Sequence, residues 1–339
     1  MRSLCVEVAK DRGESVRKIL LEMGLLDISL KVKRRDGTIL FPVLSAKGLP
    51  AGLPVMDMEF EERSLAETDY KKLMHLPDGL QEDLPTSFDV IGDVAVIKLP
   101  DPLLPYVHEV GAALRRVLPR LRLVALDRGV KGELRVRDLE IIAGLGELET
   151  LHTEYGVKLL IDPSKAYFNP RLSNERMRIA SLVRPGEKVI DMFAGVGPFS
   201  IVIAKHASPA IVYAIDLNHE AVELMKRNIA LNRVKNVVAI EGDARTVIFD
   251  LPNPDRMIMN LPHNAVEFFH DALTRLNLGG TIHLYHICEK DEICDTVERL
   301  KAEASGSGVE IEVARQEELK TYSPSMSVFS LDIVLRQWR

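Results

Sequence analysis

From residue 188 onward, short apolar runs alternate with amphipathic stretches of helical period. The expected strands are residues 188–194, 211–216, 236–244, 256–262 and 281–287, and the expected helices are residues 198–205, 219–232, 265–276 and 291–304. Regular alternation of this kind predicts an α/β fold, in which a parallel sheet has helices on both faces. Two final runs, 309–315 and 327–335, follow one another without a helix, so we expect them to pair antiparallel at one edge of the sheet.

The segment before residue 150 has a different pattern and predicts two smaller α+β domains. The first, residues 1–62, is expected to hold a strand at 4–9, a helix at 13–24 and extended runs at 28–33 and 38–44. The two extended runs flank Arg35-Asp36-Gly37, which is a hairpin-turn signal. A polar stretch with two prolines, residues 63–86, predicts a linker to the next domain.

The second small domain is expected to cover residues 87–148. Its strand is interrupted at Gly92-Asp93, a helix is expected at 106–118, and basic extended segments follow. The large domain, residues 149–339, should open with strands at 150–155 and 157–162 and a helix at 174–183.

The net charge of −6 does not by itself indicate a nucleic-acid partner, but the distribution of charge does. Residues 115–137 hold eight Lys or Arg against two acidic residues, and a second basic run lies at 31–35. Either run alone is typical of a solvated face. Two such runs outside the large domain favour a surface that binds the phosphate backbone of a nucleic acid.

The remaining composition indicates a globular protein, which we expect to be soluble and cytoplasmic because no signal peptide or apolar span is visible. Three cysteines, Cys5, Cys288 and Cys294, form no CxxC pair, and a buried thiol is the ordinary interpretation for each. We therefore expect no metal site.

The first strand of the large domain ends in a turn rich in small residues, Asp191-Met-Phe193-Ala-Gly195-Val-Gly197. Glycines let the backbone approach a ligand closely, and the helix after them points free N–H groups at the same place. A dinucleotide-binding turn would have a third glycine, where this chain has Ser200. An acid at the strand end suits the cationic end of S-adenosylmethionine better than a pyrophosphate.

Two more acids end the next two strands. Asp216 could accept hydrogen bonds from both ribose hydroxyls, and Asp243 could meet the adenine amino group. The alternative for each is a helix N-cap. Three acids at successive strand ends fit one ligand lying across the carboxyl edge of the sheet.

The fourth strand ends in Asn260-Leu261-Pro262, at the place where the transferable methyl group is expected. An amide can hold the polar edge of a base, and proline makes the wall beside it rigid. An ordinary turn is the alternative, because Asn and Pro both favour turns.

Several longer motifs carry a resemblance to a known family. They are SFDVIGD, VKGELRVRDLE, IDPSKAYFNPRLSNER, DMFAGVGPFSI and MNLP. Together they resemble the archaeal-type tRNA (guanine(37)-N1)-methyltransferases over nearly the whole chain. The resemblance implies a class I, Rossmann-like methyltransferase domain behind two small domains. It also implies that the first domain grips the outer corner of the tRNA while the others hold the anticodon loop.

The resemblance also implies roles for individual residues. Glu175 matches the general base, Arg135 the residue that meets the flipped guanine, Tyr167 an aromatic near that base, and Asn260 the amide that positions it. The residues expected at the RNA are Arg135, Arg137, Arg171, Arg176 and Pro262. Leu134 stands where the family has an aromatic residue.

The chemistry asks for the same residue types. Guanine N1 carries a proton at neutral pH, and a carboxylate within reach can remove it during methyl transfer. A guanidinium would stabilise the charge that develops on O6. A loop nucleotide leaves its stack more readily than one in a duplex. Glu175 could instead only favour a helix start, and Arg135 could only contact a phosphate.

Other functions stay open at this stage. One is the related transfer of an aminocarboxypropyl group from the same cofactor to a wyosine precursor. Another is a tRNA-binding protein that has lost catalysis. A third possibility is methylation of a protein or small molecule, but this function would not explain the two small N-terminal domains and their basic runs. We expect the protein to be a monomer that binds tRNA, and we expect no association with a membrane.

Overall fold

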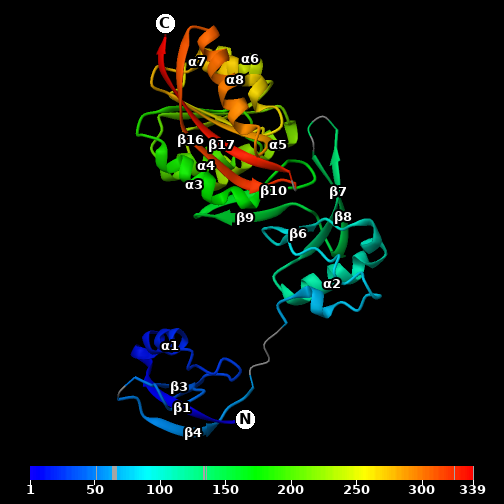
Figure 1. Ribbon diagram of the computed structural model, residues 1–339, viewed down its shortest axis with the longest axis vertical. Helices are drawn as coiled ribbons and strands as arrows, with labels where there is room; N and C mark the ends of the chain where they lie inside the picture. Colours follow the sequence, from blue (N-terminus) through cyan, green and yellow to red (C-terminus); the bar gives the residue numbers. More distant parts are fainter. Residues whose placement is uncertain (51, 63–66, 133, 135, 324, 339) are drawn as a thin grey trace. The chain divides into compact units, whose positions relative to one another are not determined.

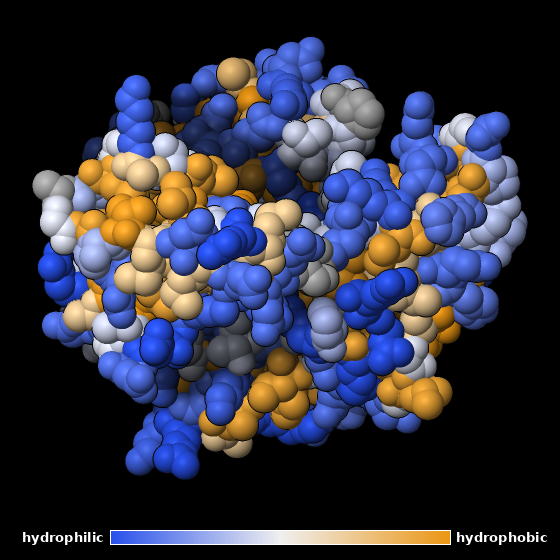
Figure 2. Space-filling model, turned by 90° about the horizontal axis from the view of Figure 1, so that it is seen from below, coloured by the Kyte–Doolittle hydropathy of each residue, from blue (hydrophilic) through white to orange (hydrophobic). Residues whose placement is uncertain are grey.

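The computed structural model describes residues 1–50, 52–62, 67–132, 134, 136–323 and 325–338. They form two compact units, Met1–Lys72 and Leu73–Arg339, and the boundary lies inside the predicted linker. Among the described residues, no helix is long and apolar enough to cross a membrane. Hydrophilic side chains separate several apolar patches on the face shown in Figure 2, which is ordinary for a protein surface.

The first unit is a four-stranded antiparallel sheet with one helix. Its sheet has the order β2-β3-β1-β4, where β1 is Arg2–Ala9, β2 is Lys33–Arg35, β3 is Thr38–Pro42 and β4 is Val55–Glu59. Helix α1 (Gly13–Glu22) buries Val16 and Leu20 against Val6 and Phe41 of the sheet. The amphipathic period of the sequence therefore predicted this helix correctly.

The expected hairpin between β2 and β3 is present, but its first strand is shorter than predicted. Asp36 and Gly37 both have positive φ, and Arg35 pairs with Thr38 across them. The strand expected at 28–33 is wrong for most of its length. Asp27 Oδ1 accepts hydrogen bonds from Ser29 N at 3.0 Å and Ser29 Oγ at 2.5 Å, so a local side-chain turn replaces the extended backbone.

The second unit begins with a smaller sheet of order β5-β6-β7-β8. The strands are β5 (Asp89–Ile91), β6 (Val94–Ile97), β7 (Leu123–Lys131) and β8 (Val136–Gly144). Gly92-Asp93 turns the chain between β5 and β6, which pair antiparallel. Helix α2 (Val107–Val117) packs so closely on this sheet that a Cβ on Gly111 would lie 2.7 Å from Ala143 Cβ.

The large sheet has the order β13-β12-β11-β14-β15-β17-β16. Its strands are β11 (Lys188–Asp191), β12 (Ile211–Asp216), β13 (Val237–Glu241), β14 (Arg256–Met259), β15 (Thr281–Glu289), β16 (Val309–Thr321) and β17 (Met326–Trp338). The first five strands are parallel, whereas β17 pairs antiparallel with both β15 and β16. The predicted fold and its antiparallel edge are confirmed.

Helices cover both faces of this sheet (Figure 1). One face carries α3 (Ser173–Leu182), α4 (Pro198–His206) and α5 (His219–Asn232), and the other carries α6 (Ala244–Val247), α7 (Phe269–Arg275) and α8 (Ile293–Gly306). Consecutive strand residues enter opposite cores: Val189 lies in the first and Ile190 in the second. This is the Rossmann-like arrangement of class I methyltransferases.

A two-stranded sheet of β9 (Thr150–Glu154) and β10 (Val157–Ile161) joins the small sheet to the large one along the chain. Two buried asparagines of α5 hold it in place. Asn228 Oδ1 accepts a hydrogen bond from Leu160 N at 2.6 Å, and Asn232 Oδ1 accepts one from Lys158 N at 2.9 Å. These bonds give partners to the backbone N–H groups of β10 that do not pair with β9.

Candidate active site

The turn after β11 has the shape that its glycines predict. Gly195 and Gly197 have φ of 55° and 83°, in the left-handed region. A Cβ on Gly197 would also lie 2.9 Å from Met225 Cγ of α5, so a side chain has no room there. Helix α4 starts directly afterwards, at Pro198, and its first N–H groups face the end of β11.

Asp191 and Asp216 end neighbouring strands beside this turn, and neither forms an ion pair among the described residues. Asp191 is wholly buried: its Oδ2 accepts a hydrogen bond from Ser200 Oγ at 2.8 Å, whereas Oδ1 has no partner in the described part of the chain. Burial, with the nearby charge of Asp216, raises the pKa of Asp191 to about 7. Burial also raises the pKa of Asp216.

Asp216 holds both the glycine turn and the residue before the following helix, because its Oδ1 also accepts a hydrogen bond from Asn218 N at 2.9 Å. Its Oδ2 accepts a hydrogen bond from Gly195 N at 2.6 Å, and the N-cap of α5 is Asn218. Asp243, by contrast, is exposed and does cap α6, because it accepts from Arg245 N at 2.8 Å. Its predicted contact with adenine remains a prediction.

Phe193 lies in the same turn and is half-buried. Its ring packs edge-to-face on Phe268, with centroids 4.8 Å apart. The aromatic pair fixes the outer wall of the turn where a flat ring of a ligand could lie.

The segment that contains Tyr167 lies next to the turn. Tyr167 O would be 3.5 Å from a Cβ on Gly195, and Asn218 Nδ2 donates to Lys165 O at 2.7 Å. The side chain of Tyr167 is 51 % exposed. The sequence motif that resembles the RNA-modifying family is thus brought directly against the predicted cofactor loop.

Basic side chains gather beside Tyr167 around one acid, Asp89 of β5. Asp89 Oδ2 accepts from Arg137 of β8 at 3.0 Å, and Asp89 Oδ1 accepts from Arg171 at 2.9 Å. We call Arg137, Arg171 and Lys320 the basic cluster. Burial, with the charges of Arg171 and Arg137, lowers the pKa of Lys320.

The sequence analysis did not identify Lys320, which lies near the end of β16, or Tyr322, which directly follows that strand. The ring of Tyr322 packs on that of His263, with centroids 5.6 Å apart, and so reaches the segment of Pro262. The Lys-Thr-Tyr sequence at the end of β16 was the available signal. Arg135 lies outside the described residues.

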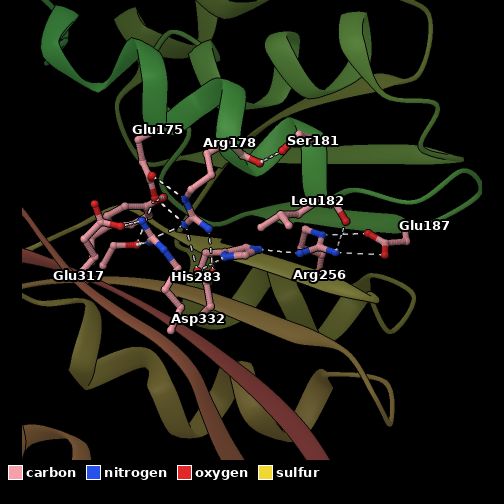
Figure 3. A network of polar contacts seen from close by, with 12 residues as sticks. Glu175, Arg178, Ser181, Leu182, Glu187, Arg256, His283, Glu317 and Asp332 are labelled. Carbon is pink, nitrogen blue, oxygen red and sulfur yellow. Dashed lines mark hydrogen bonds and ion pairs between the residues drawn. The ribbon is translucent and has the colours of Figure 1, made fainter.

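Glu175 begins α3 and is only 7 % exposed (Figure 3). Arg178 donates to both carboxylate oxygens at 2.7 Å, Tyr285 donates to Oε1 at 2.9 Å and Ser330 donates to Oε1 at 3.1 Å. Burial by itself raises the pKa of Glu175, but the hydrogen bonds and the charge of Arg178 bring it below its ordinary value.

Strand pairing relates Asn260, which follows β14, to Glu175 of α3. Met259 of β14 pairs with Leu284 of β15, so Asn260 is level with Tyr285, the partner of Glu175. The ring of Tyr285 packs on Phe199 of α4, with centroids 5.8 Å apart. The predicted base and amide therefore both lie at the carboxyl edge that carries the glycine turn.

Sequence profiles match this chain along most of its length. The TRM5/TYW2 methyltransferase domain matches residues 150–312, the TYW2 N-terminal domain residues 71–147, and the tRNA methyltransferase 5 N-terminal domain residues 5–47. Trm5b of Pyrococcus abyssi, a tRNA (guanine(37)-N(1))-methyltransferase, is 40 % identical over 97 % of this chain and 98 % of its own. The chain belongs to the TRM5/TYW2 family of tRNA-modifying enzymes.

Solved structures of the family agree. The complex of aTrm5 with tRNALeu has a TM-score of 0.70 at 32 % identity, covering 98 % of this chain and all of that one. The TYW2 of Methanocaldococcus jannaschii with AdoMet has a TM-score of 0.57 at 26 % identity, covering 74 % and 100 %. An aminocarboxypropyltransferase of M. jannaschii is 32 % identical over 70 % of this chain and 94 % of its own.

The residues of this TRM5/TYW2 site fit S-adenosylmethionine. The donor carries positive charge, and the site offers two carboxylates that form no ion pair among the described residues, one of them with an oxygen that no described group satisfies. Burying such groups without a partner is costly, so a cationic ligand would relieve them. Asp191 and Asp216 would hold its polar end and ribose.

One predicted RNA contact of the TRM5/TYW2 site is not supported. Arg176 is 1 % exposed, and Glu154 accepts hydrogen bonds from its Nε at 2.6 Å and its Nη2 at 2.5 Å. It also donates to Asn169 O and lies over the Phe168 ring. With no surface free for RNA, Arg176 instead ties α3 to β9.

Proposed function

We propose that this protein transfers the methyl group of S-adenosylmethionine to N1 of guanosine at position 37 of the tRNA anticodon loop. One observation carries the proposal: the acid-lined glycine turn, Glu175 and Asn260 share one sheet edge, and the Tyr167 segment links that edge to the basic cluster. These contacts support a proposed donor site, a proposed base and a proposed phosphate-binding surface close to one sheet edge.

The cofactor, when bound, supplies a methyl group on a positively charged sulfur. Glu175 takes the proton from guanine N1 as the N–C bond forms and the S–C bond breaks, so that the proton ends on the carboxylate. Asn260 holds the polar edge of the base. Arg135, predicted to face O6, would stabilise the charge that develops there.

The basic cluster and Tyr167 would hold the anticodon loop around the extruded base. Arg137 and Arg171 give charge-assisted contacts to phosphates, and Tyr167 offers a ring for stacking. Pro262, whose carbonyl accepts a hydrogen bond from Ile287 N at 2.9 Å, would form part of the wall beside the base. We further propose that residues 1–62, 87–148 and 149–339 act as three domains, that the first grips the outer corner of the tRNA, and that the enzyme works as a monomer.

The test uses the full chain, S-adenosylmethionine and an unmodified tRNA transcript with guanosine at position 37. Nuclease mapping with mass detection should find one methyl group on that nucleotide. A matched transcript with adenosine at this position should stay unmodified. Absence of modification together with absence of cofactor binding would instead favour a protein that binds tRNA without catalysis.

One observation favours a second activity, because residues 71–147 match the TYW2 N-terminal domain. The alternative reaction would add an aminocarboxypropyl group from the same cofactor to a wyosine precursor. Mass detection separates the two, since that group is much heavier than a methyl group. A tRNA carrying the wyosine precursor, offered in parallel, should gain no aminocarboxypropyl group if the methyltransferase proposal holds.

A further inference from the structure

The sheet face beneath α3 is unusually polar. Cross-strand pairing places His283 of β15 opposite Asp332 of β17, and Tyr285 opposite Ser330. Alternate residues of a strand share a face, so all four side chains lie on the side that α3 covers. His283, Tyr285 and Ser330 are 0 % exposed, and Asp332 is 7 % exposed. Packing α3 on an apolar sheet face would have avoided the free-energy cost of removing these polar groups from water.

These groups form one continuous network that ends at Glu175 (Figure 3). Arg178 stands between two carboxylates: it donates to Glu175, and it donates to Asp332 Oδ2 at 2.7 Å and Oδ1 at 3.1 Å. Asp332 Oδ1 lies 2.6 Å from His283 Nδ1. The guanidinium of Arg178 is therefore fixed by Asp332, a second buried acid, on the side away from Glu175.

The geometry also fixes the protonation of His283. Arg256 Nη1 lies 2.7 Å from His283 Nε2, and an arginine can only donate, so Nε2 accepts. The proton must then lie on Nδ1, which donates to Asp332. Burial, with the charge of Arg256, lowers the pKa of His283 and keeps it neutral. Glu187 in turn holds Arg256 with two hydrogen bonds.

The two oxygens of Glu175 are not equivalent. Oε1 accepts from Arg178, Tyr285 and Ser330, which fills its acceptor positions, whereas Oε2 accepts only from Arg178 Nε. Oε2 is therefore the atom with an uncommitted lone pair. The proton of guanine N1 would go to this oxygen.

We propose that Arg178, held in place by Asp332 and His283, is a positioning residue that presents Glu175 Oε2 to the substrate and keeps this carboxylate ready to take a proton. The inference rests on the proposed role of Glu175 as the base. Arg178 itself touches no substrate in this account. It acts through the carboxylate that it orients.

The electrostatic surroundings of Glu175 are defined from every side. Arg178 faces Glu175 from α3, and Tyr285 faces it from β15. Asp332 of β17 lies on the far side of Arg178. Arg315 and Glu317 of β16 form an ion pair, and Arg315 contacts Ser330 of β17. Arg178 is the only cation among these that contacts Glu175 directly in the described residues. Its removal would leave a buried carboxylate near the negative charge of Asp332, which favours protonation of Glu175.

The test is the pH dependence of single-turnover methylation between about pH 5 and about pH 8, with S-adenosylmethionine saturating at every pH. The unaltered enzyme should show a level rate, because Arg178 holds the pKa of Glu175 below its ordinary value. Arg178→Met should show a rate that falls by up to about tenfold per pH unit at the acidic end, because Glu175 then takes up a proton within this range. Arg178→Lys should restore the level profile, with a lower rate at every pH.

Asp332→Asn should act differently, because it removes a negative charge while Arg178 stays. Its rate should be lower at every pH but level at the acidic end. Arg336→Met, the same change at an exposed ion pair, should behave like the unaltered enzyme. Calorimetric titration with S-adenosylmethionine identifies any variant that is misfolded, and Arg178→Gln replaces Arg178→Met if that variant does not bind.

A level profile for a folded neutral variant at position 178 would overturn the inference, and so would an acidic fall in Arg178→Lys equal to that in Arg178→Met. Glu175→Gln separates this failure from that of the proposed function. If Glu175→Gln keeps full activity, the base assignment itself fails. If it is inactive and Arg178→Met is level, only the positioning role fails.

Discussion

The two halves of the large sheet treat buried carboxylates in opposite ways. On β11 and β12, Asp191 and Asp216 have no cationic partner among the described residues, and burial raises the pKa of each. On the half that α3 covers, Glu175 of this helix and Asp332 of β17 share Arg178, and the pKa of each is lowered despite burial. The first half lacks a positive charge that a ligand can supply, whereas the second half already contains one.

This difference shows how one sheet edge can serve both reactants of a methyl transfer. A cationic donor would gain most where carboxylates are unpaired. A base needs a carboxylate that stays ionised, and Arg178 provides this.

The largest effect is expected from Glu175→Gln. Glutamine keeps the size of the side chain but cannot remove the N1 proton, so single-turnover methylation should fall by about 10²–10⁴-fold. Affinity for S-adenosylmethionine, measured by calorimetry, should stay unchanged because the donor half is intact. Glu223→Gln, at an exposed ion pair on α5, is the matched control. Normal turnover by Glu175→Gln would end the base assignment.

Arg176→Met should be the most destabilising of these changes. It would leave Glu154 buried without its partner, which costs about 3–5 kcal/mol of unfolding free energy in denaturant titrations. Burial raises the pKa of Glu154, but hydrogen bonds from His152 and Arg176 lower it to about 2. The stability that this ionised carboxylate contributes is therefore full above its ordinary pKa and is lost as pH falls towards 2. Arg227→Met, at an exposed pair, should cost at most about 1 kcal/mol. Equal losses in both variants would contradict the buried-pair interpretation.

In the donor half, Asp191→Asn should weaken binding of S-adenosylmethionine by about 10–100-fold, the usual value of a charge-assisted hydrogen bond. Calorimetric titration measures this directly. Asp295→Asn, an exposed acid on α8, should bind like the unaltered enzyme. If Asp191→Asn binds equally well, the unpaired acid is not part of the donor site.

The smallest expected effect is the release of a proton from Asp191 when S-adenosylmethionine binds. With a pKa of about 7, Asp191 is partly protonated at neutral pH in the free protein, and a cationic ligand should drive that proton off. Titrations at about pH 7 in buffers of different ionisation enthalpy should therefore show release of a fraction of one proton, and affinity should rise as pH increases. Asp191→Asn should abolish the release. Proton uptake would contradict the sign of the argument.

Local patterns predicted the large domain well, because its elements depend on short-range periodicity. The strand at 211–216 and the helix at 219–232 agree with the structure to the residue. The glycine turn was also predictable, since few residue types can adopt its backbone. The strand at 28–33 failed because a side-chain hydrogen bond of Asp27 competes locally with extended structure. Cys294 is exposed rather than buried.

The network behind Glu175 could not be predicted, because it depends on pairing between distant strands. His283 and Asp332 are 49 residues apart in sequence and meet only through the register of β15 and β17. The available signal was polar residues at a spacing of two within otherwise apolar strands. Burial of Arg176 escaped prediction for the same reason, because Glu154 lies on another element.

The most direct test is a crystal structure of the enzyme with S-adenosylhomocysteine and a tRNA that carries guanosine at position 37. The account predicts that guanine N1 lies about 2.6–3.2 Å from Glu175 Oε2, with the Asn260 amide on the same base and the cofactor beside Asp191 and Asp216. A guanine bound away from Glu175, with that carboxylate still covered by Arg178 and out of reach, would contradict it.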